Sequence, residues 1–266
     1  MKYFYSFSLL LLSQALFSQT APSPLPNAHA HNDYEHERPL FEALSHGFTS
    51  VEADVHLING ELYVAHDHPS DLSQTPTLKA LYLDPLARWV EQHEGKVYAD
   101  YDAPFYLMID VKTRAVPTYE ALKKLLLPYR TILHHYENGV LQPGPILIFL
   151  SGNRAIELVQ QETLRLVGID GRPSDIGKGY SSDFMPVISD NYRKHLSWRG
   201  KKRNKKPAEL EALKKWIAEA HQEKKKVRLW ATPERKKVWR ILLEAGVDFL
   251  NTDQLSELQG FLIKKR

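Results

Sequence analysis

Paired polar side chains stand two residues apart at three places in the sequence. These pairs are His29 and His31, Glu52 and Asp54, and Asp110 and Lys112. Side chains two residues apart share one face of a strand. Each pair lies at or near the C-terminal end of a run with strand character, the end at which barrel enzymes place their active sites. We therefore expect the three pairs to serve one site.

Three of these side chains are carboxylates, those of Glu52, Asp54 and Asp110. In a confined cavity they would repel one another and lose hydration unless a cation neutralised them. Ligands that are all oxygen suit Mg²⁺ or Ca²⁺ better than zinc, and they leave positions open for water and a substrate phosphate. The sequence therefore predicts a divalent cation, Mg²⁺ or Ca²⁺, held by these three residues.

Cleavage of a phosphodiester also requires one group that takes a proton from the attacking hydroxyl and another that gives a proton to the departing alkoxide. Histidine suits both tasks near neutral pH. His31 and His66 stand beside acidic residues and are the catalytic candidates, with the choice of acid and base left open. Lys112 would offer a positive charge to a phosphate oxygen. His29 either orients another group or fills the barrel mouth.

Short apolar runs alternate with amphipathic stretches along the chain, which is typical of parallel α/β architecture. We expect strands at 25–29, 50–55, 62–65, 105–111, 146–150, 187–189, 227–230 and 247–250. We expect helices at 119–127, 155–166, 208–220, 235–244 and 254–262, and a glycine-rich surface loop at 168–180. Eight strands is the count of a (β/α)8 TIM-type barrel, so the predicted fold class is α/β with one such barrel.

The second and third expected strands are too close in sequence for a parallel crossover, which needs a dozen or more residues. Asn59-Gly60 is a hairpin turn signal and predicts an antiparallel, hairpin-like unit that projects beyond the barrel. A two-residue loop would pair His66 with Ala53 and turn it away from Glu52. A three-residue loop with a bulge at Gly60 would place His66 and Glu52 on one face, and we favour this version.

The N-terminal residues predict an export signal at 1–19, followed by one barrel domain at 20–266 and a periplasmic or secreted location. The absence of cysteine from the sequence excludes disulfides, thiolate metal sites and cysteine nucleophiles. A net charge of +3 is too weak to indicate a nucleic-acid partner. The basic run from Arg199 to Lys206 predicts a solvated loop or a weak contact with an anionic membrane surface. No obligate protein partner is inferred.

These motifs resemble the PLC-like phosphodiesterases, and within them the glycerophosphodiester phosphodiesterase branch. That family shows an early histidine, an E-x-D pair after an A-x-x-x-G helix end, and a His-Asp dipeptide after a glycine turn. The matching residues are His31, then Ala43 to Gly47 leading to Glu52 and Asp54, then His66-Asp67. LMIDVKT at 107–113 resembles the family's acidic-x-Lys strand. VRLWATP at 227–233 and GVDFLNTD at 246–253 resemble its last two strands, which makes Trp230 a wall of the pocket.

The resemblance implies a metal-dependent phosphoric diester hydrolase whose substrate is a glycerophosphodiester or a phospholipid headgroup. The wording HNDY at 31–34 is similar to a branch that includes proteins named for altered inheritance of mitochondria. The family's usual His-Arg-Gly appears here as His31-Asn32-Asp33, so an arginine that could contact phosphate is missing at that place. His29, Asn32 and Trp230 are the candidates for contact with substrate.

Two alternatives stay open. His29 and His31 also match the paired histidine ligands of amidohydrolase-type metal hydrolases, although no further histidine follows the strands expected at 146–150 and 187–189. The other alternative is a barrel that binds phosphate-bearing ligands without turning them over.

Overall fold

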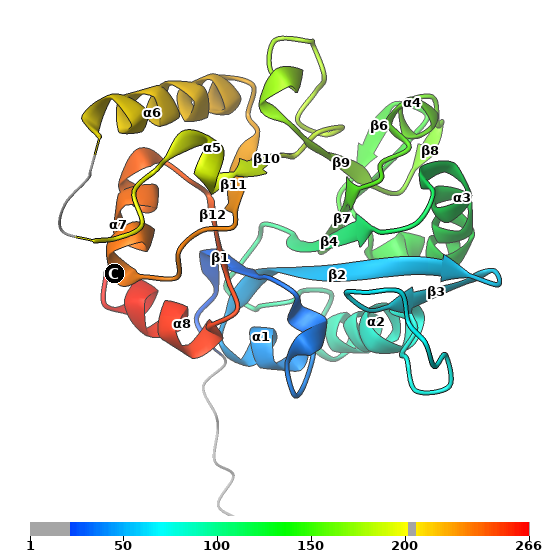
Figure 1. The fold of residues 1–266 in the computed structure, drawn as a ribbon. Helices are drawn as coiled ribbons and strands as arrows, with labels where there is room; N and C mark the ends of the chain where they lie inside the picture. Colours follow the sequence, from blue (N-terminus) through cyan, green and yellow to red (C-terminus); the bar gives the residue numbers. More distant parts are fainter. Residues whose placement is uncertain (1–21, 202–205, 266) are drawn as a thin grey trace, which may run out of the picture.

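Eight parallel strands form a closed ring in the computed structural model, which describes residues 22–201 and 206–265. In ring order they are β1 (Leu25–Ala30), β2 (Phe48–Ile58), β4 (Phe105–Val111), β7 (Ile146–Gly152), β9 (Gly168–Gly171), β10 (Val187–Asn191), β11 (Lys226–Trp230) and β12 (Phe249–Thr252). The pairing of β12 with β1 and of β1 with β2 closes the ring (Figure 1). The predicted (β/α)8 TIM-type barrel is confirmed.

Helices surround this ring on its outer side (Figure 1). They are α1 (Phe41–Ser45), α2 (Asp84–Gln92), α3 (Ala115–Leu126), α4 (Ile156–Gln160), α5 (Tyr192–His195), α6 (Pro207–Gln222), α7 (Lys236–Ala245) and α8 (Leu255–Ile263). Short 3-10 or π turns are found at Asp33–Glu35, Lys79–Leu83, Leu127–Ile132 and Pro173–Asp175. A small antiparallel sheet of β5 (His135–Glu137), β6 (Val140–Gln142) and β8 (Leu164–Arg165) lies outside the ring. Of the described helices, none combines the length and the apolar character that crossing a bilayer requires.

The barrel strands separate two cores. Residues such as Val51, Leu107 and Ile109 belong to the large core between strands and helices. A second cluster consists of Tyr106, Met108, Leu147, Phe149, Val187 and Phe249. Its members alternate with those of the first core along the strands, so they point into the barrel. Toward the C-terminal ends of the strands, the inward-facing positions are occupied by polar instead of apolar side chains. These polar side chains form the site.

Strand β9 corrects one prediction, because Gly168–Gly171 belongs to the barrel wall and is fully buried. A Cβ added at Gly168 would come within 2.8 Å of Pro186 Cδ, and one at Gly171 within 2.5 Å of Ile188 Cδ1. These glycines therefore serve close packing, whereas their number suggested a surface loop. The predicted count of eight was right only because the hairpin strand at 62–65 was counted in place of β9.

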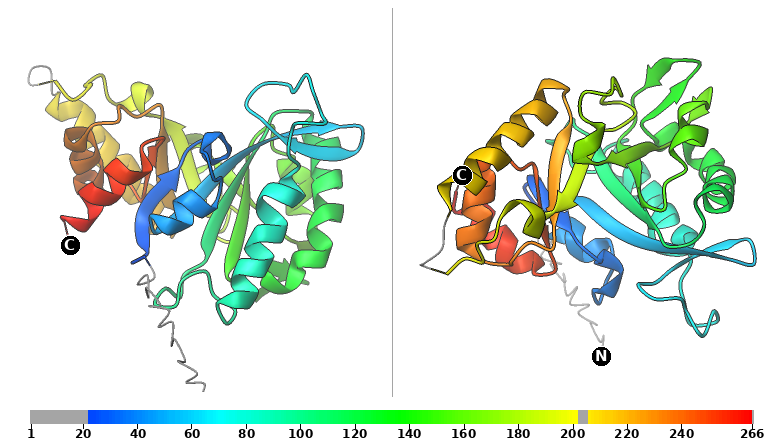
Figure 2. Two further views of the ribbon diagram at one scale, coloured as in Figure 1. Left: turned by 90° about the horizontal axis from the view of Figure 1, so that it is seen from below. Right: turned by 45° about the horizontal axis from the view of Figure 1, so that its top comes forward.

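The hairpin of β2 and β3 (Glu61–Val64) projects beyond the ring (Figure 2). Ile58 pairs with Glu61, so the loop contains only Asn59 and Gly60, and both have positive φ, of 51° and 88°. The favoured bulge at Gly60 was therefore wrong. The two φ values match a type I′ turn, whose twist suits antiparallel strands.

The helix predicted at 155–166 was too long, because α4 ends at Gln160 and the chain then enters β8 of the small sheet. Two other predictions fall wholly or partly on residues outside the described ranges. The predicted export signal at 1–19 lies wholly outside them, and four residues of the basic run, 202–205, do so as well.

Candidate active site

A cavity of about 320 Å³ opens at the C-terminal ends of the barrel strands. It is lined by His31, Asn32, Glu52, His66, Asp110, Lys112, Ser151, Gly152, Arg172, Arg228 and Trp230. Seven predicted site residues are therefore brought together here, from β1, β2, β4, β11 and the end of the β2–β3 hairpin. Asp54 and His29 are both fully buried and lie outside this lining.

Glu52, Asp54 and Asp110 form the acidic cluster of the site, in which one carboxylate oxygen of each lies within 4.8 Å of the others. Asp54 and Asp110 are direct neighbours across β2 and β4. Asp54 Oδ1 is buried and accepts no hydrogen bond from any described residue. Burial, followed by the charge of Glu52, raises the pKa of Asp54 above its ordinary value. An unsatisfied buried oxygen among three acids fits a hard divalent cation.

Lys112 bridges two members of this cluster. Its Nζ lies 2.8 Å from Asp54 Oδ2 and 2.5 Å from Asp110 Oδ2. Burial opposes the charge of this lysine, but hydrogen bonds to Asp110 and Asp54 raise the pKa of Lys112. The ammonium group therefore neutralises part of the acidic charge, and it leaves Asp54 Oδ1 unused. It also lines the cavity, where its charge would attract an anion.

His31 follows directly after β1, and its Nδ1 donates to Asp253 Oδ1 at 2.6 Å. Asp253 comes after β12 and is itself held through its backbone N–H, which donates to Glu234 Oε1 at 2.6 Å. Burial lowers the pKa of His31, but the hydrogen bond to Asp253 and the charge of Glu52 outweigh it and raise that pKa. His31 is therefore suited to hold a proton near neutral pH.

His66 is the more exposed of the two candidate histidines, with 57% of its side chain accessible. Its Nδ1 lies 3.2 Å from Asp54 Oδ2 and 3.3 Å from the hydroxyl of Tyr34. The paired residues of β2 and β3 end at Val55 and Val64, and one further hydrogen bond, from Ala65 N–H to Asp54 O at 3.2 Å, precedes the point where the chain turns toward the site. His66 consequently reaches the site although the hairpin loop has only two residues.

His29 lies beneath the cavity in a buried polar network. Its Nδ1 lies 2.7 Å from Ser50 Oγ, and its Nε2 lies 3.4 Å from Glu52 Oε2 and 3.2 Å from the Arg228 guanidinium. Burial, followed by the charge of Arg228, lowers the pKa of His29 well below its ordinary value. This buried position does not fit direct contact between His29 and a substrate. It fits a role in which His29 supports Glu52.

The same network weighs against the amidohydrolase alternative. Ligation by His29 requires a free ring nitrogen, yet a cationic guanidinium stands beside its Nε2. His31 is turned toward Asp253 by its Nδ1. Among the described residues, the group of acids and histidines close enough to hold a metal contains carboxylates alone.

Four further residues of the site were missed in the sequence. Arg228 and Arg172 line the cavity, and Arg228 donates to Glu52 Oε2 at 3.2 Å and to Asn251 Oδ1 at 2.7 Å. Arg228 stands two residues before Trp230, so strand alternation would have placed both on the inner face. Tyr34 lies in the 3-10 turn that follows β1, and Asp253 lies directly after β12; neither position belongs to a strand, so strand alternation does not reveal their contacts with Asp54 and His31.

The chain that carries this site resembles several known proteins. A family model described as an AIM6-like phosphodiesterase domain matches residues 21–170. Altered inheritance of mitochondria protein 6 homolog from Arthroderma benhamiae is 31% identical over 268 residues, covering 90% of this chain and 84% of its own. Altered inheritance of mitochondria protein 6 from Eremothecium gossypii is 30% identical over 272 residues, covering 89% and 69%.

One solved structure is titled glycerophosphodiester phosphodiesterase from Agrobacterium tumefaciens. It has a TM-score of 0.46 and 13% identity, and it covers 89% of this chain and 99% of its own. The assignment of the fold rests instead on the strand pairing of the chain itself.

The comparisons correct one prediction and confirm another. The predicted periplasmic or secreted location is wrong, because the relatives are named for altered inheritance of mitochondria, and those names point to mitochondria and not to export. The resemblance seen in the HNDY, E-x-D and His-Asp motifs is confirmed by the family match over more than half of the chain. The chain belongs to the AIM6-like phosphodiesterase domain family.

Proposed function

We propose that the protein is a phosphodiesterase that depends on a divalent cation, Mg²⁺ or Ca²⁺, and cleaves a glycerophosphodiester or a phospholipid-headgroup diester. One observation carries this proposal: three carboxylates lie within 4.8 Å of one another at the strand ends, and one of them has an unsatisfied buried oxygen. Membership of a phosphodiesterase domain family supports the same chemistry.

A cation held by Glu52, Asp54 and Asp110 would add positive charge against the phosphate oxygens as negative charge develops there. Lys112, Arg172 and Arg228 contribute further positive charge along the cavity. Arginine pairs with phosphate through two parallel hydrogen bonds. These two arginines therefore replace the one that is missing from His31-Asn32-Asp33.

The environments of the two histidines suggest a division of roles. His31 keeps its proton through Asp253, which suits a general acid that protonates the departing alkoxide. His66 is more exposed and stands beside the carboxylate of Asp54, which suits a general base that accepts the proton of the attacking hydroxyl. Trp230, with 38% of its surface exposed, covers one side of the bound diester.

Hydrolysis assays test this proposal directly. Bis(p-nitrophenyl) phosphate and glycerophosphodiesters are supplied with magnesium, calcium or zinc, and the assays are repeated with EDTA. We expect activity with magnesium or calcium that EDTA abolishes, and a loss of about 10²- to 10⁴-fold in kcat for His31→Ala and for His66→Ala.

Each other outcome selects a different account. Activity with zinc alone would favour the amidohydrolase alternative. Binding of glycerophosphodiesters without turnover under any of the three cations would favour an inactive, ligand-binding barrel. Activity that neither histidine substitution reduces would refute the proposed acid-base roles.

A further inference from the structure

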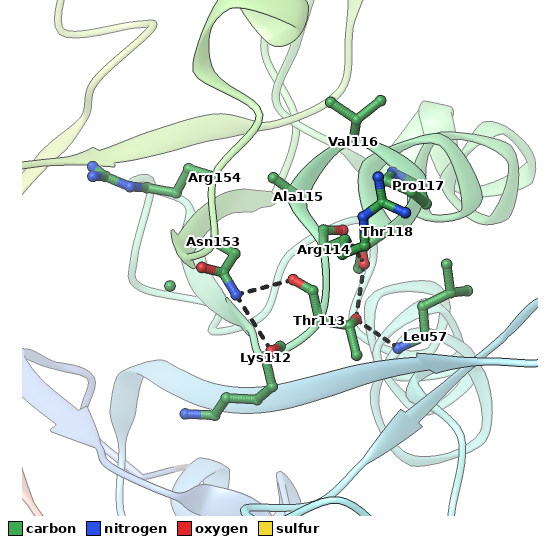
Figure 3. A pocket seen from close by; sticks show the side chains of 11 residues that line it. Leu57, Lys112, Thr113, Arg114, Ala115, Val116, Pro117, Thr118, Asn153 and Arg154 are labelled. Carbon is green, nitrogen blue, oxygen red and sulfur yellow. Dashed lines mark hydrogen bonds between the residues drawn. The ribbon is translucent and has the colours of Figure 1, made fainter.

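A second, larger cavity of about 1010 Å³ adjoins the site (Figure 3). It lies between the outer part of β2, the start of α3 and the segment that follows β7, and it shares Lys112 and Gly152 with the smaller cavity. We call it the arginine groove, after Arg114 and Arg154 in its lining. Because the two cavities share lining residues, a ligand bound at the acidic cluster can extend into the groove.

The charged side chains that line the arginine groove are all cationic among the described residues. Among the described residues that line it, Lys112, Arg114 and Arg154 are cationic and none is acidic. Lys112 is already paired with Asp54 and Asp110. The groove therefore depends on the two arginines for its charge.

Neither arginine forms an ion pair with a carboxylate of the residues that the structure describes. The exposed guanidinium of Arg114 makes no hydrogen bond or ion pair with any residue in the described parts of the chain. Arg154 is partly buried and donates to the backbone carbonyl of Asp170. Burial, followed by the charge of Arg172, lowers the pKa of Arg154, although the charges of nearby carboxylates, Asp170 first among them, act in the opposite direction.

The remaining lining sets the size of the occupant. Leu57, Ala115 and Pro117 give the groove an apolar wall, and Thr113 and Asn153 are engaged in hydrogen bonds with neighbouring chain segments (Figure 3). Arg114 lies four positions after Asp110, so their Cα atoms are at most about 14 Å apart. A single polyol or sugar ring bearing a phosphate spans a gap of that order.

We propose that the arginine groove receives the second alcohol arm of the diester, and that this arm carries a negatively charged group of its own. This inference rests on the proposed function and narrows its substrate class to diesters with an additional anion. A neutral arm or a long acyl chain would leave the Arg114 guanidinium without a partner and would not use the positive charge of Arg154.

Calorimetry on the full chain tests the inference with a matched pair of diesters, glycerophosphoinositol and glycerophosphoinositol 4-phosphate. A variant that carries both His31→Ala and His66→Ala is used with magnesium, so that turnover does not interfere. An exposed ion pair contributes up to about 1 kcal/mol, or about fivefold in affinity. We therefore expect the phosphorylated diester to bind up to about fivefold more tightly, and more than about twofold more tightly.

Arg114→Ala should reduce this affinity ratio to below about twofold. Lys124→Ala provides the matched control, because Lys124 is an exposed cation near the other end of α3 and should leave the ratio unchanged. Equal affinities for the two diesters, a ratio that survives Arg114→Ala, or binding of neither diester would overturn the inference.

Hydrolysis by the unmodified protein is followed separately by phosphorus NMR. Turnover of both diesters together with equal affinities would overturn the inference and leave the proposed function standing. No turnover with any cation would refute the proposed function, and the affinity ratio would still decide the occupant of the groove.

Discussion

Replacement of Asp54 by asparagine separates cation binding from fold stability. The substitution keeps the shape of the side chain and removes its charge. Tyr34, His66 and Lys112 can still direct their donors at one amide oxygen, which takes the place of Oδ2. The lost pairing with Lys112 is opposed by relief of a buried charge that repels Glu52. We therefore expect the cation-free protein to melt within a few degrees of the unmodified one.

The response to the cation should differ strongly. A ligand at 100 times its Kd stabilises the native state by about 2.7 kcal/mol. For a chain of this size 1 kcal/mol corresponds to roughly 2–4 °C, so the unmodified protein should gain about 5–10 °C in Tm. If the asparagine weakens cation affinity about 100-fold, the same concentration contributes about 0.4 kcal/mol, or about 1 °C.

Differential scanning fluorimetry with titrated magnesium and calcium measures this difference. Asp102→Asn is the matched control, because the side chain of Asp102 is 92% exposed and pairs with Lys96 away from the site. The reasoning fails if Asp54→Asn keeps the full cation-dependent rise in Tm, or if the unmodified protein shows no rise with either ion.

Three further predictions concern the histidine pair, the HNDY loop and the barrel wall. Asp253→Asn replaces the charged partner of His31 by a neutral acceptor, which weakens the interaction that raises the pKa of His31. The alkaline limb of the pH profile of kcat/KM should therefore move to lower pH, and an unmoved limb would count against His31 as the acid. Burial raises the pKa of Asp33 to about 6, so the native state favours the protonated carboxyl. The free energy of unfolding should therefore be highest below about pH 4 and should decline, by up to about 3 kcal/mol, as pH rises through 6. Urea unfolding of Asp33→Asn should lack this decline, and parallel pH slopes would exclude Asp33 as its source. Gly171→Ala should lower the free energy of unfolding by roughly 1–3 kcal/mol, because the added Cβ would collide with a side chain of β10. Gly260→Ala is the control, since it has open space around it and should not destabilise the protein. Equal free energies of unfolding for the two variants would contradict the close packing of β9.

Most barrel strands could be predicted from the sequence because β-branched and apolar runs mark them plainly. The strand β4 was predicted with its observed bounds, Phe105–Val111. Strand β9 was not predicted because its close packing in the barrel wall requires small residues. Glycines such as Gly168 and Gly171 are also typical of loops. Helix α4 was overextended because an apolar periodicity continues past Gln160 into a strand of the small sheet.

The candidate site could be predicted only as far as local alternation reaches. Glu52, Asp54 and Asp110 follow from the period of two along β2 and β4, and the structure brings them together. The partner of His31 could not be predicted in this way, since Asp253 is 222 residues away and meets it only through ring closure. The hairpin loop was misjudged because His66 reaches Asp54 from beyond the hydrogen bond of Ala65 N–H to Asp54 O, where the register of the strands no longer sets the direction of a side chain.

Anomalous diffraction from crystals grown with Mn²⁺, as a stand-in for magnesium, tests the central claim most directly. The account predicts one strong peak at about 2.0–2.6 Å from carboxylate oxygens of Glu52, Asp54 and Asp110, with Asp54 Oδ1 among the ligands. Crystals that show no peak there, with Lys112 still seated between Asp54 and Asp110, would contradict it.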